Sequence, residues 1–201
     1  MTDARDKKDV RSDDSQPDDP QSAAGTAPDT QADKPRALTR VTTLFDEHED
    51  RIRLSGEIDD GSTCVIWITQ RLLLRLLPRL FEWLEREVPD VMAGSAIQEF
   101  RQQTAAAALE HQAPVQTDAQ AQSWLLTSVD VSTRRQGVRL LFKGDADDQR
   151  ISLGLAGRPL RQWLGVLHGQ CKRGGWPMEV WPSWMETTEP AATPGRGAMM
   201  H

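Results

Sequence analysis

The sequence predicts an α+β fold in which a strand-strand-strand-helix unit occurs twice, after a disordered N-terminal tail. Apolar residues alternate with polar ones in three short runs and then recur at helical spacing, the pattern of an antiparallel meander followed by an amphipathic helix. The same order returns about 87 residues later in the chain. Residues 1–37, in contrast, contain no Leu, Ile, Phe or Trp.

The predicted tail, residues 1–37, contains nine Asp and six Lys or Arg, a net charge of −3. Such a segment cannot bury enough apolar surface to offset the entropy lost on ordering, so we expect it to be disordered. We interpret it as a solubilising segment, and the alternative is an acidic docking arm. Residues 186–201 are predicted to be disordered as well.

The first half, residues 38–88, begins with three predicted strands. They are expected at residues 41–45, 51–58 and 63–68. The turn between the last two contains Asp60-Gly61, which readily takes the positive φ of a tight turn. Thr69 is a predicted N-cap for a helix over 70–87 with a leucine stripe, and Pro78 predicts a kink or a break within it.

The second half, residues 123–185, repeats this order. Strands are expected at residues 123–131, 137–143 and 149–155, followed by a helix over 158–172. We interpret the repeat as an internal duplication arranged about a pseudo-twofold axis; a chance likeness of two meanders is the alternative. The matched apolar positions are Cys64 with Ile151, Ile66 with Leu153, Ile68 with Leu155, Leu73 with Leu160, Leu76 with Trp163, Leu77 with Leu164 and Leu80 with Leu167.

A helical linker, residues 89–122, joins the two halves. An Ala- and Gln-rich helix is expected over 93–111, with Ile97, Phe100, Ala107 and Ala108 near one side. This apolar stripe is thin, so we expect the helix to pack loosely on the body of the protein.

Composition excludes several classes of protein. The net charge of −6 at pH 7 and a pI near 5.3 disfavour a dedicated nucleic-acid binder, which needs a basic face. No apolar run is long enough for a membrane span, and no secretion signal is present, so we expect no membrane partner and a cytoplasmic location. Two cysteines are too few for a disulfide scaffold. The Arg-over-Lys, Ala-rich composition is typical of a bacterial protein.

Catalytic motifs are missing from the sequence. It has no phosphate-binding Gly-Lys-Ser/Thr loop, GxSxG, HExxH, calcium loop or CxxC pair. His168 and Cys171 have the spacing of two metal ligands on one helix, but two ligands do not make a site. We therefore expect no metal, no cofactor and no enzymatic activity. An enzyme that uses the turn acids Glu57, Asp59 and Asp60 is the third of three hypotheses.

A Trp-Pro segment after the second helix is the first candidate binding surface. It is stiffened by its prolines, and interface hot spots favour Trp. The segment either packs as a lid on the core or offers aromatic anchors to a partner. Its candidate residues are Trp176, Pro177, Trp181, Pro182 and Trp184.

A series of arginines is the second candidate surface. Arg71, Arg75 and Arg79 recur every fourth residue, which places them along one face of the first helix. Such a face is either simply solvated or a site for an anion or an acidic partner. Arg53, Arg139 and Lys143 on the predicted middle strands extend the candidate anion-binding set.

The order of elements resembles the tandem repeats of PUR and Whirly-type single-stranded nucleic-acid binders. The resemblance implies nucleic-acid binding on the sheet, where aromatic and basic side chains stack bases and neutralise phosphates. The middle strands here offer only Arg53, Arg139, Phe142 and Lys143 for that role. Our leading hypothesis is therefore a non-enzymatic protein-interaction module, a monomer or homodimer with an unidentified protein partner, and single-stranded nucleic-acid binding is the alternative.

Overall fold

The computed structural model describes residues 35–86, 94–110 and 112–186, which all belong to one compact unit, Lys34–His201. Most of the predicted tail and nearly all of the predicted C-terminal segment lie outside the described residues. The strands are β1 Arg36–Asp46, β2 Arg51–Ile58, β3 Thr63–Ile68, β4 Gln122–Leu125, β5 Ser128–Arg134, β6 Gly137–Lys143 and β7 Arg150–Ala156. The helices are α1 Gln70–Arg86, α2 Gly94–Ala107, α3 Gly157–Arg173 and the short 3-10 helix η1 Ser183–Met185.

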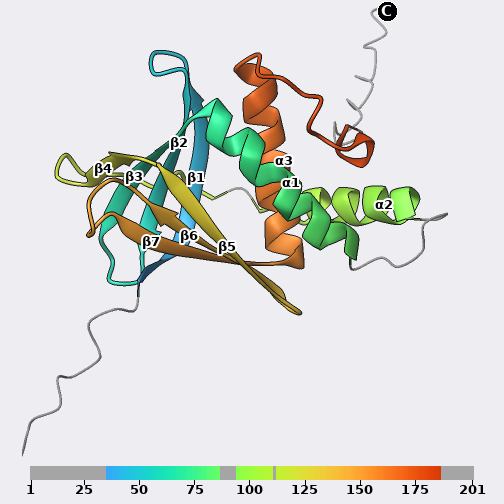
Figure 1. The fold of residues 1–201 in the computed structure, drawn as a ribbon, viewed down its shortest axis with the longest axis horizontal. Coiled ribbons are helices and arrows are strands. Elements are labelled where there is room, and N and C mark those ends of the chain that lie inside the picture. Colours follow the sequence, from blue (N-terminus) through green and yellow to red (C-terminus); the bar gives the residue numbers. More distant parts are fainter. Residues whose placement is uncertain (1–34, 87–93, 111, 187–201) are drawn as a thin grey trace, which may run out of the picture. The chain divides into compact units, whose positions relative to one another are not determined.

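The strands form one seven-stranded sheet in the order β4-β3-β2-β1-β7-β6-β5, so the fold is α+β as predicted (Figure 1). β1, β2 and β3 pair antiparallel with one another, as do β5, β6 and β7. The two meanders are joined by parallel pairs, β1 with β7 and β3 with β4. Both predicted halves therefore share one sheet.

The sheet curls until its two outer strands meet in a single stretch of chain. Only Leu126 and Thr127 separate β4 from β5. The amide of Leu126 donates to the carbonyl of Trp67 on β3 (2.9 Å), and the amide of Thr127 donates to the carbonyl of Lys143 on β6 (2.9 Å). The segment that the sequence predicted as one strand over 123–131 is thus two strands that serve opposite edges of the sheet.

The core fills the inside of the curled sheet and the space beneath the helices. Alternation along the strands places one apolar set inward, as the period of two requires. The strand residues in this core include Ile52, Leu54, Ile66, Ile68, Leu140, Phe142, Ile151 and Leu153, each at most 4% exposed. Gly56 has no side chain at a crowded point, because a Cβ there would lie 2.3 Å from Leu38 Cδ2.

Helix α1 follows β3 directly and buries its leucine stripe. The hydroxyl of Thr69 accepts a hydrogen bond from the amide of Leu72 (3.3 Å), which confirms Thr69 as an N-cap. The helix runs without interruption through Pro78, so the break that the sequence allowed is not present. The turn before β3 has Gly61 at φ 83°, the positive φ expected from the Asp-Gly signal.

Helix α2 buries a different face from the one predicted. Its buried residues are Gln98, Gln102 and Ala105, whereas Phe100 is 69% exposed. The reason is hydrogen bonding: the amide of Gln98 donates to the carbonyl of Leu84 (2.8 Å), and that of Gln102 donates to the carbonyl of Arg161 (3.0 Å). The expectation of an apolar contact face on this helix is therefore wrong.

Helix α3 ends at Gly174 and Gly175, and Gly175 has φ 64°. The chain then turns back across the helices through the Trp-Pro segment. Trp176, Trp181 and Trp184 are each at most 6% exposed. The rings of Trp181 and Trp184 lie 5.5 and 5.8 Å from the ring of Phe81 on α1, so in this structure the segment packs as a lid.

Candidate binding groove

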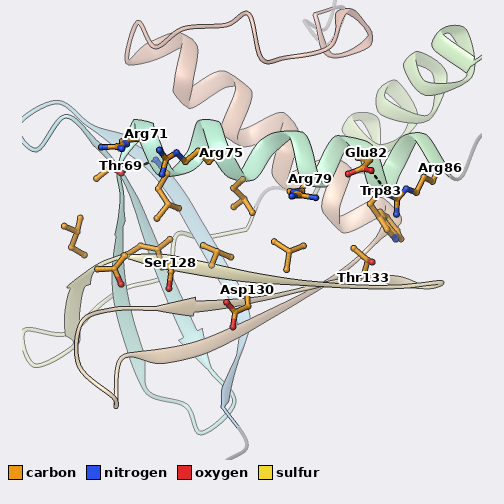
Figure 2. A pocket seen from close by; sticks show the side chains of 17 residues that line it. Thr69, Arg71, Arg75, Arg79, Glu82, Trp83, Arg86, Ser128, Asp130 and Thr133 are labelled. Atoms are coloured by element: carbon orange, nitrogen blue, oxygen red, sulfur yellow. Dashed lines mark hydrogen bonds and ion pairs between the residues drawn. The ribbon is translucent and has the colours of Figure 1, made fainter.

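A groove of about 990 Å³ separates α1 from β4 and β5 (Figure 2). Figure 2 shows α1 crossing above β5, with the arginines on the helix and Ser128, Asp130 and Thr133 on the strand below. The sequence places these walls together because β3 leads straight into α1 while β4, paired with β3, leads straight into β5. The groove therefore lies between α1 and β5, the two elements that follow the paired strands β3 and β4.

The upper wall carries the arginine series. Arg71, Arg75 and Arg79 are exposed, line the groove, and have no ion pair or side-chain hydrogen bond with any described residue. Arg86, seven residues after Arg79 on the same helix, pairs with Glu82. The prediction that the first three arginines share one helix face is confirmed, and their positive charge is not neutralised within the described part of the chain.

The floor of the groove is apolar. Leu72, Leu76, Val129 and Val131 line it between the two walls. Trp83 also lines it, but its ring is buried and its indole N–H donates to the backbone carbonyl of Arg134 (3.1 Å). The floor can therefore contact aliphatic groups, but it presents no open aromatic face.

The lower wall is the outer edge of β5. This strand is at one end of the sheet order and has a strand partner, β6, on one side only. The backbone amides and carbonyls of such an edge are available to an added strand. Asp130 on β5 forms an ion pair with Lys143 on β6. The acidic groups of the groove, Asp130 and Glu82, are thus both paired.

The remaining predicted anion-binding residues lie outside the groove, and each interacts with a neighbouring side chain. Arg53 donates to the hydroxyl of Thr117 (3.0 Å) and lies 6.0 Å from the ring of Trp67. Arg139 donates to the hydroxyl of Ser152 (3.2 Å). Together with the ion-paired Lys143, these residues do not line the groove.

The predicted aromatic anchors are packed against the chain itself. The ring of Trp176 lies 5.8 Å from that of Phe45, and the guanidinium of Arg161 lies 5.4 Å from the ring of Trp184. Of the two prolines, Pro177 is exposed and Pro182 is half-buried. In this arrangement Pro177 is exposed and the indole rings are buried.

The acidic residues considered for catalysis lie near the β2–β3 turn and form ion pairs or hydrogen bonds there. Glu57 forms an ion pair with Arg40 (2.9 Å), and Asp59 accepts a hydrogen bond from the amide of Ala37 (3.3 Å). Hydrogen bonds from Ser62 hold the pKa of Asp60 below its usual range. None of the three lines the groove.

No group of three His, Cys, Asp or Glu side chains within the described ranges could hold a metal ion. Burial raises the pKa of the Cys171 thiol to about 12, and burial lowers that of His168. A thiol with so high a pKa is a poor source of the thiolate that binds metals. None of the helices in the described part of the chain combines the length and the apolar character that a membrane crossing needs.

Comparison with known proteins gives no relative: no family model, no curated protein and no solved structure matches this chain.

The spacing of four residues predicted the arginine wall on α1. No sequence pattern predicted the wall formed by β5. The alternation Val129, Val131 predicts a strand, but only the pairing of the whole sheet determines that β5 keeps one open edge. Non-local pairing of this kind leaves no local signal in the sequence.

Proposed function

We propose that the protein is a non-enzymatic interaction module of the bacterial cytoplasm that binds an extended acidic segment of another protein in the α1/β5 groove. The observation that carries the proposal is the set of three unpaired arginines, Arg71, Arg75 and Arg79, above the open edge of β5. A cationic wall beside a strand edge is complementary to a chain that is anionic and can pair as a strand.

Charge supports an acidic occupant. Glu82 and Asp130 are already paired with Arg86 and Lys143, so the arginine series gives the groove a net positive charge. The protein as a whole is acidic, with a net charge of −6. A positive groove on an acidic protein attracts an acidic segment to one place and repels it from the rest of the surface.

The apolar floor supports an occupant with alternating side chains. In an added strand, successive side chains point to opposite faces. The set that faces α1 would contact Leu76, Val129 and Val131 through its aliphatic stems and bring carboxylates to the arginines, and the other set would point away from the helix. The backbone of the occupant would pair with the edge of β5, as in other cases of strand addition.

We also propose that the two halves arose by duplication. The sequence match at offsets of 86 and 87 agrees with the register of the sheet: Leu54 pairs with Ile66 in the first half, and Leu140 pairs with Leu153 in the second. On this match β4 and β5 together correspond to β1.

The parallel joins between the halves support the same proposal. Leu38 of β1 pairs with Leu153 of β7, and Trp124 of β4 pairs with Ile66 of β3. Residues 38 and 124 are again separated by 86 positions, so each half contacts the other through equivalent positions. A twofold arrangement about the axis of the curled sheet accounts for both joins.

The duplication relates the α1/β5 groove to a cavity of about 500 Å³ between α3 and β1. There, Gln162 and Val166 occupy the positions of Arg75 and Arg79. The chain itself forms the other wall with residues 108–110, 112 and 113, and Arg40 donates to the carbonyl of Ala113 (2.8 Å). One groove is thus lined by an irregular segment of the same chain, which supports an extended peptide as the occupant of the other.

Single-stranded nucleic acid is less well supported as the occupant. Binding of single strands relies on aromatic rings on which bases stack. The one aromatic side chain that lines the groove, Trp83, is buried.

The Trp-Pro segment stays a candidate contact for the partner through Pro177.

The test is a binding titration with a fluorescent seven-residue peptide of alternating Glu and Val, matched in length to β5. The peptide should bind, the Lys–Val peptide should not, and the affinity should fall as salt is added. A double variant, Arg75→Glu with Arg79→Glu, should weaken binding by about tenfold or more.

The matched control is Arg101→Glu with Arg158→Glu, two exposed arginines outside the groove that give the same change in net charge. An equal loss of affinity in both variants would show that net charge alone causes the effect, and it would refute the groove as the binding site. If oligothymidylate bound more tightly than the acidic peptide and only the groove variant lost this binding, the occupant of the groove would be nucleic acid and not a protein segment.

A further inference from the structure

A third cavity, of about 270 Å³, lies between α2 and α3 and is separate from the α1/β5 groove. Two glycines of α3, Gly165 and Gly169, lie one turn apart in its wall. A Cβ at Gly169 would meet no atom within 4 Å. The α3 backbone itself thus forms part of the wall and leaves room that any larger residue would fill.

Two buried polar atoms belong to the residues that line this cavity, and neither has a hydrogen-bond partner. They are Gln102 Oε1 and His168 Nε2, on side chains whose residues are only 1% and 6% exposed. The neighbouring Gln98 differs, because its carbonyl oxygen accepts from Arg161 and its amide donates to Leu84. Burying a polar atom without a partner costs about 1–3 kcal/mol, so such atoms usually have one.

The mouth of the cavity carries one charge of each sign. Lys172 and Glu186 both line it and are exposed, and no ion pair joins them to each other or to another described residue. Both act on His168: burial has the largest effect and lowers its pKa, the positive charge of Lys172 lowers it further, and Glu186 raises it.

We propose that this cavity binds a small zwitterion with the chemistry of a free α-amino acid. The ammonium group donates to Gln102 Oε1 and faces Glu186, and the carboxylate faces Lys172. The aliphatic part contacts Ala106, Leu109 and Val166, which supply the apolar lining. A cavity of about 270 Å³ is smaller than the usual pocket for a drug-sized ligand, which suits a molecule of this size.

The inference stands apart from the α1/β5 groove, since no residue lines both cavities. It requires a ligand with both charges. A ligand with a single charge would leave either Lys172 or Glu186 without a partner, and a neutral aliphatic molecule would leave Gln102 Oε1 unpaired. The arrangement therefore discriminates among small molecules by charge as well as by size.

The experiment titrates the full-length protein with each of the common free L-amino acids and follows tryptophan fluorescence. Trp181 is the reporter, because its ring lies 4.9 Å from that of His168. At least one amino acid should bind at millimolar concentration or below. Butyrate and butylamine, each with one charge, should bind at least about tenfold more weakly than the best amino acid.

Two sets of variants test whether the ligand binds in this cavity. Gly169→Leu should abolish binding with the fold retained, as judged by circular dichroism, because its side chain fills the cavity. Ala96→Leu, at an exposed position of α2 outside the cavity, should bind as the unchanged protein does. Lys172→Gln and Glu186→Gln should each weaken binding by about tenfold.

Three results would overturn the proposal. The first is the absence of a response to every amino acid tested. The second is unchanged affinity in Gly169→Leu, which would put the ligand elsewhere. The third is equal binding of butyrate or butylamine and the amino acid, which would remove the requirement for a zwitterion.

Discussion

The indole N–H of Trp163 on α3 donates a 3.1 Å hydrogen bond to the hydroxyl of Thr43 on β1, and both residues are buried. The two residues are 120 positions apart in the sequence. The bond fixes α3 against a strand of the first half, on a sheet that both halves build. A second hydrogen bond joins the same two elements, from the amide of Phe45 to the side-chain oxygen of Gln170 (2.8 Å). Loss of the Thr43 hydroxyl would leave the buried indole N–H without a partner.

Replacing that hydroxyl tests the contact. Thr43→Val keeps the shape of the side chain and leaves the indole N–H of Trp163 unpaired, so the free energy of unfolding should fall by about 1–3 kcal/mol. Urea denaturation followed by circular dichroism measures the change. Thr39→Val is the control, because the Thr39 hydroxyl donates to a backbone carbonyl at an exposed site and its loss should cost less than about 0.5 kcal/mol. Equal losses in the two variants would contradict the prediction.

The Trp-Pro lid should contribute strongly to stability. Trp184 is 6% exposed and contacts Phe81 and Arg161. Trp184→Ala should therefore lower the free energy of unfolding by about 3–5 kcal/mol. Pro177→Ala, at an exposed position of the same segment, is the comparison and should cost far less. A Trp184→Ala protein as stable as the unchanged one would show that the lid is dispensable for the fold.

Local patterns in the sequence suffice for most of the strands and for the turn before β3. Alternation predicted β1, β2, β3, β6 and β7, and the Asp60-Gly61 pair predicted the turn, because both signals arise from residues that are adjacent in the chain. The division of 123–131 into β4 and β5 was not predicted. The single sheet was not predicted, since the parallel pairs of β1 with β7 and of β3 with β4 join segments far apart in sequence. The same limitation hid the strand wall of the groove.

Helix α2 shows a second limitation. The sequence interpretation assumed that the apolar side chains Ile97 and Phe100 would face the core. The buried face instead carries glutamines whose amides bond to backbone carbonyls of α1 and α3. Hydrophobic patterning cannot predict a face whose burial depends on the partners that its polar groups find.

The polar face of α2 gives a prediction with a clear contrast. Arg161 is 4% exposed and donates to the side-chain oxygen of Gln98. Gln98→Leu removes that acceptor from a buried guanidinium and should cost about 1.5–3 kcal/mol of stability. Phe100→Ser, on the exposed face, should change stability by less than about 0.5 kcal/mol. Thermal and urea unfolding of both variants provide the measurement, and the reverse ranking would restore the apolar face as the packed one.

His168 makes the stability of the fold depend on pH. Burial is the main cause that lowers its pKa from 6.5, Lys172 lowers it further, and Glu186 raises it. The cavity residues that α2 contributes are uncharged. Because the pKa is lower in the folded state, the unfolded chain binds more protons below pH 6.5, and protonation favours unfolding.

The stability that His168 contributes is fully present above pH 6.5 and is lost as the pH falls from 6.5 through the lower pKa of the folded state. Urea denaturation across that range should show a smaller loss of stability in His168→Gln than in the unchanged protein. His48→Gln, in the exposed turn between β1 and β2, controls for the substitution itself. If His168→Gln loses as much stability on acidification as the unchanged protein, then proton uptake elsewhere in the chain governs its acid sensitivity.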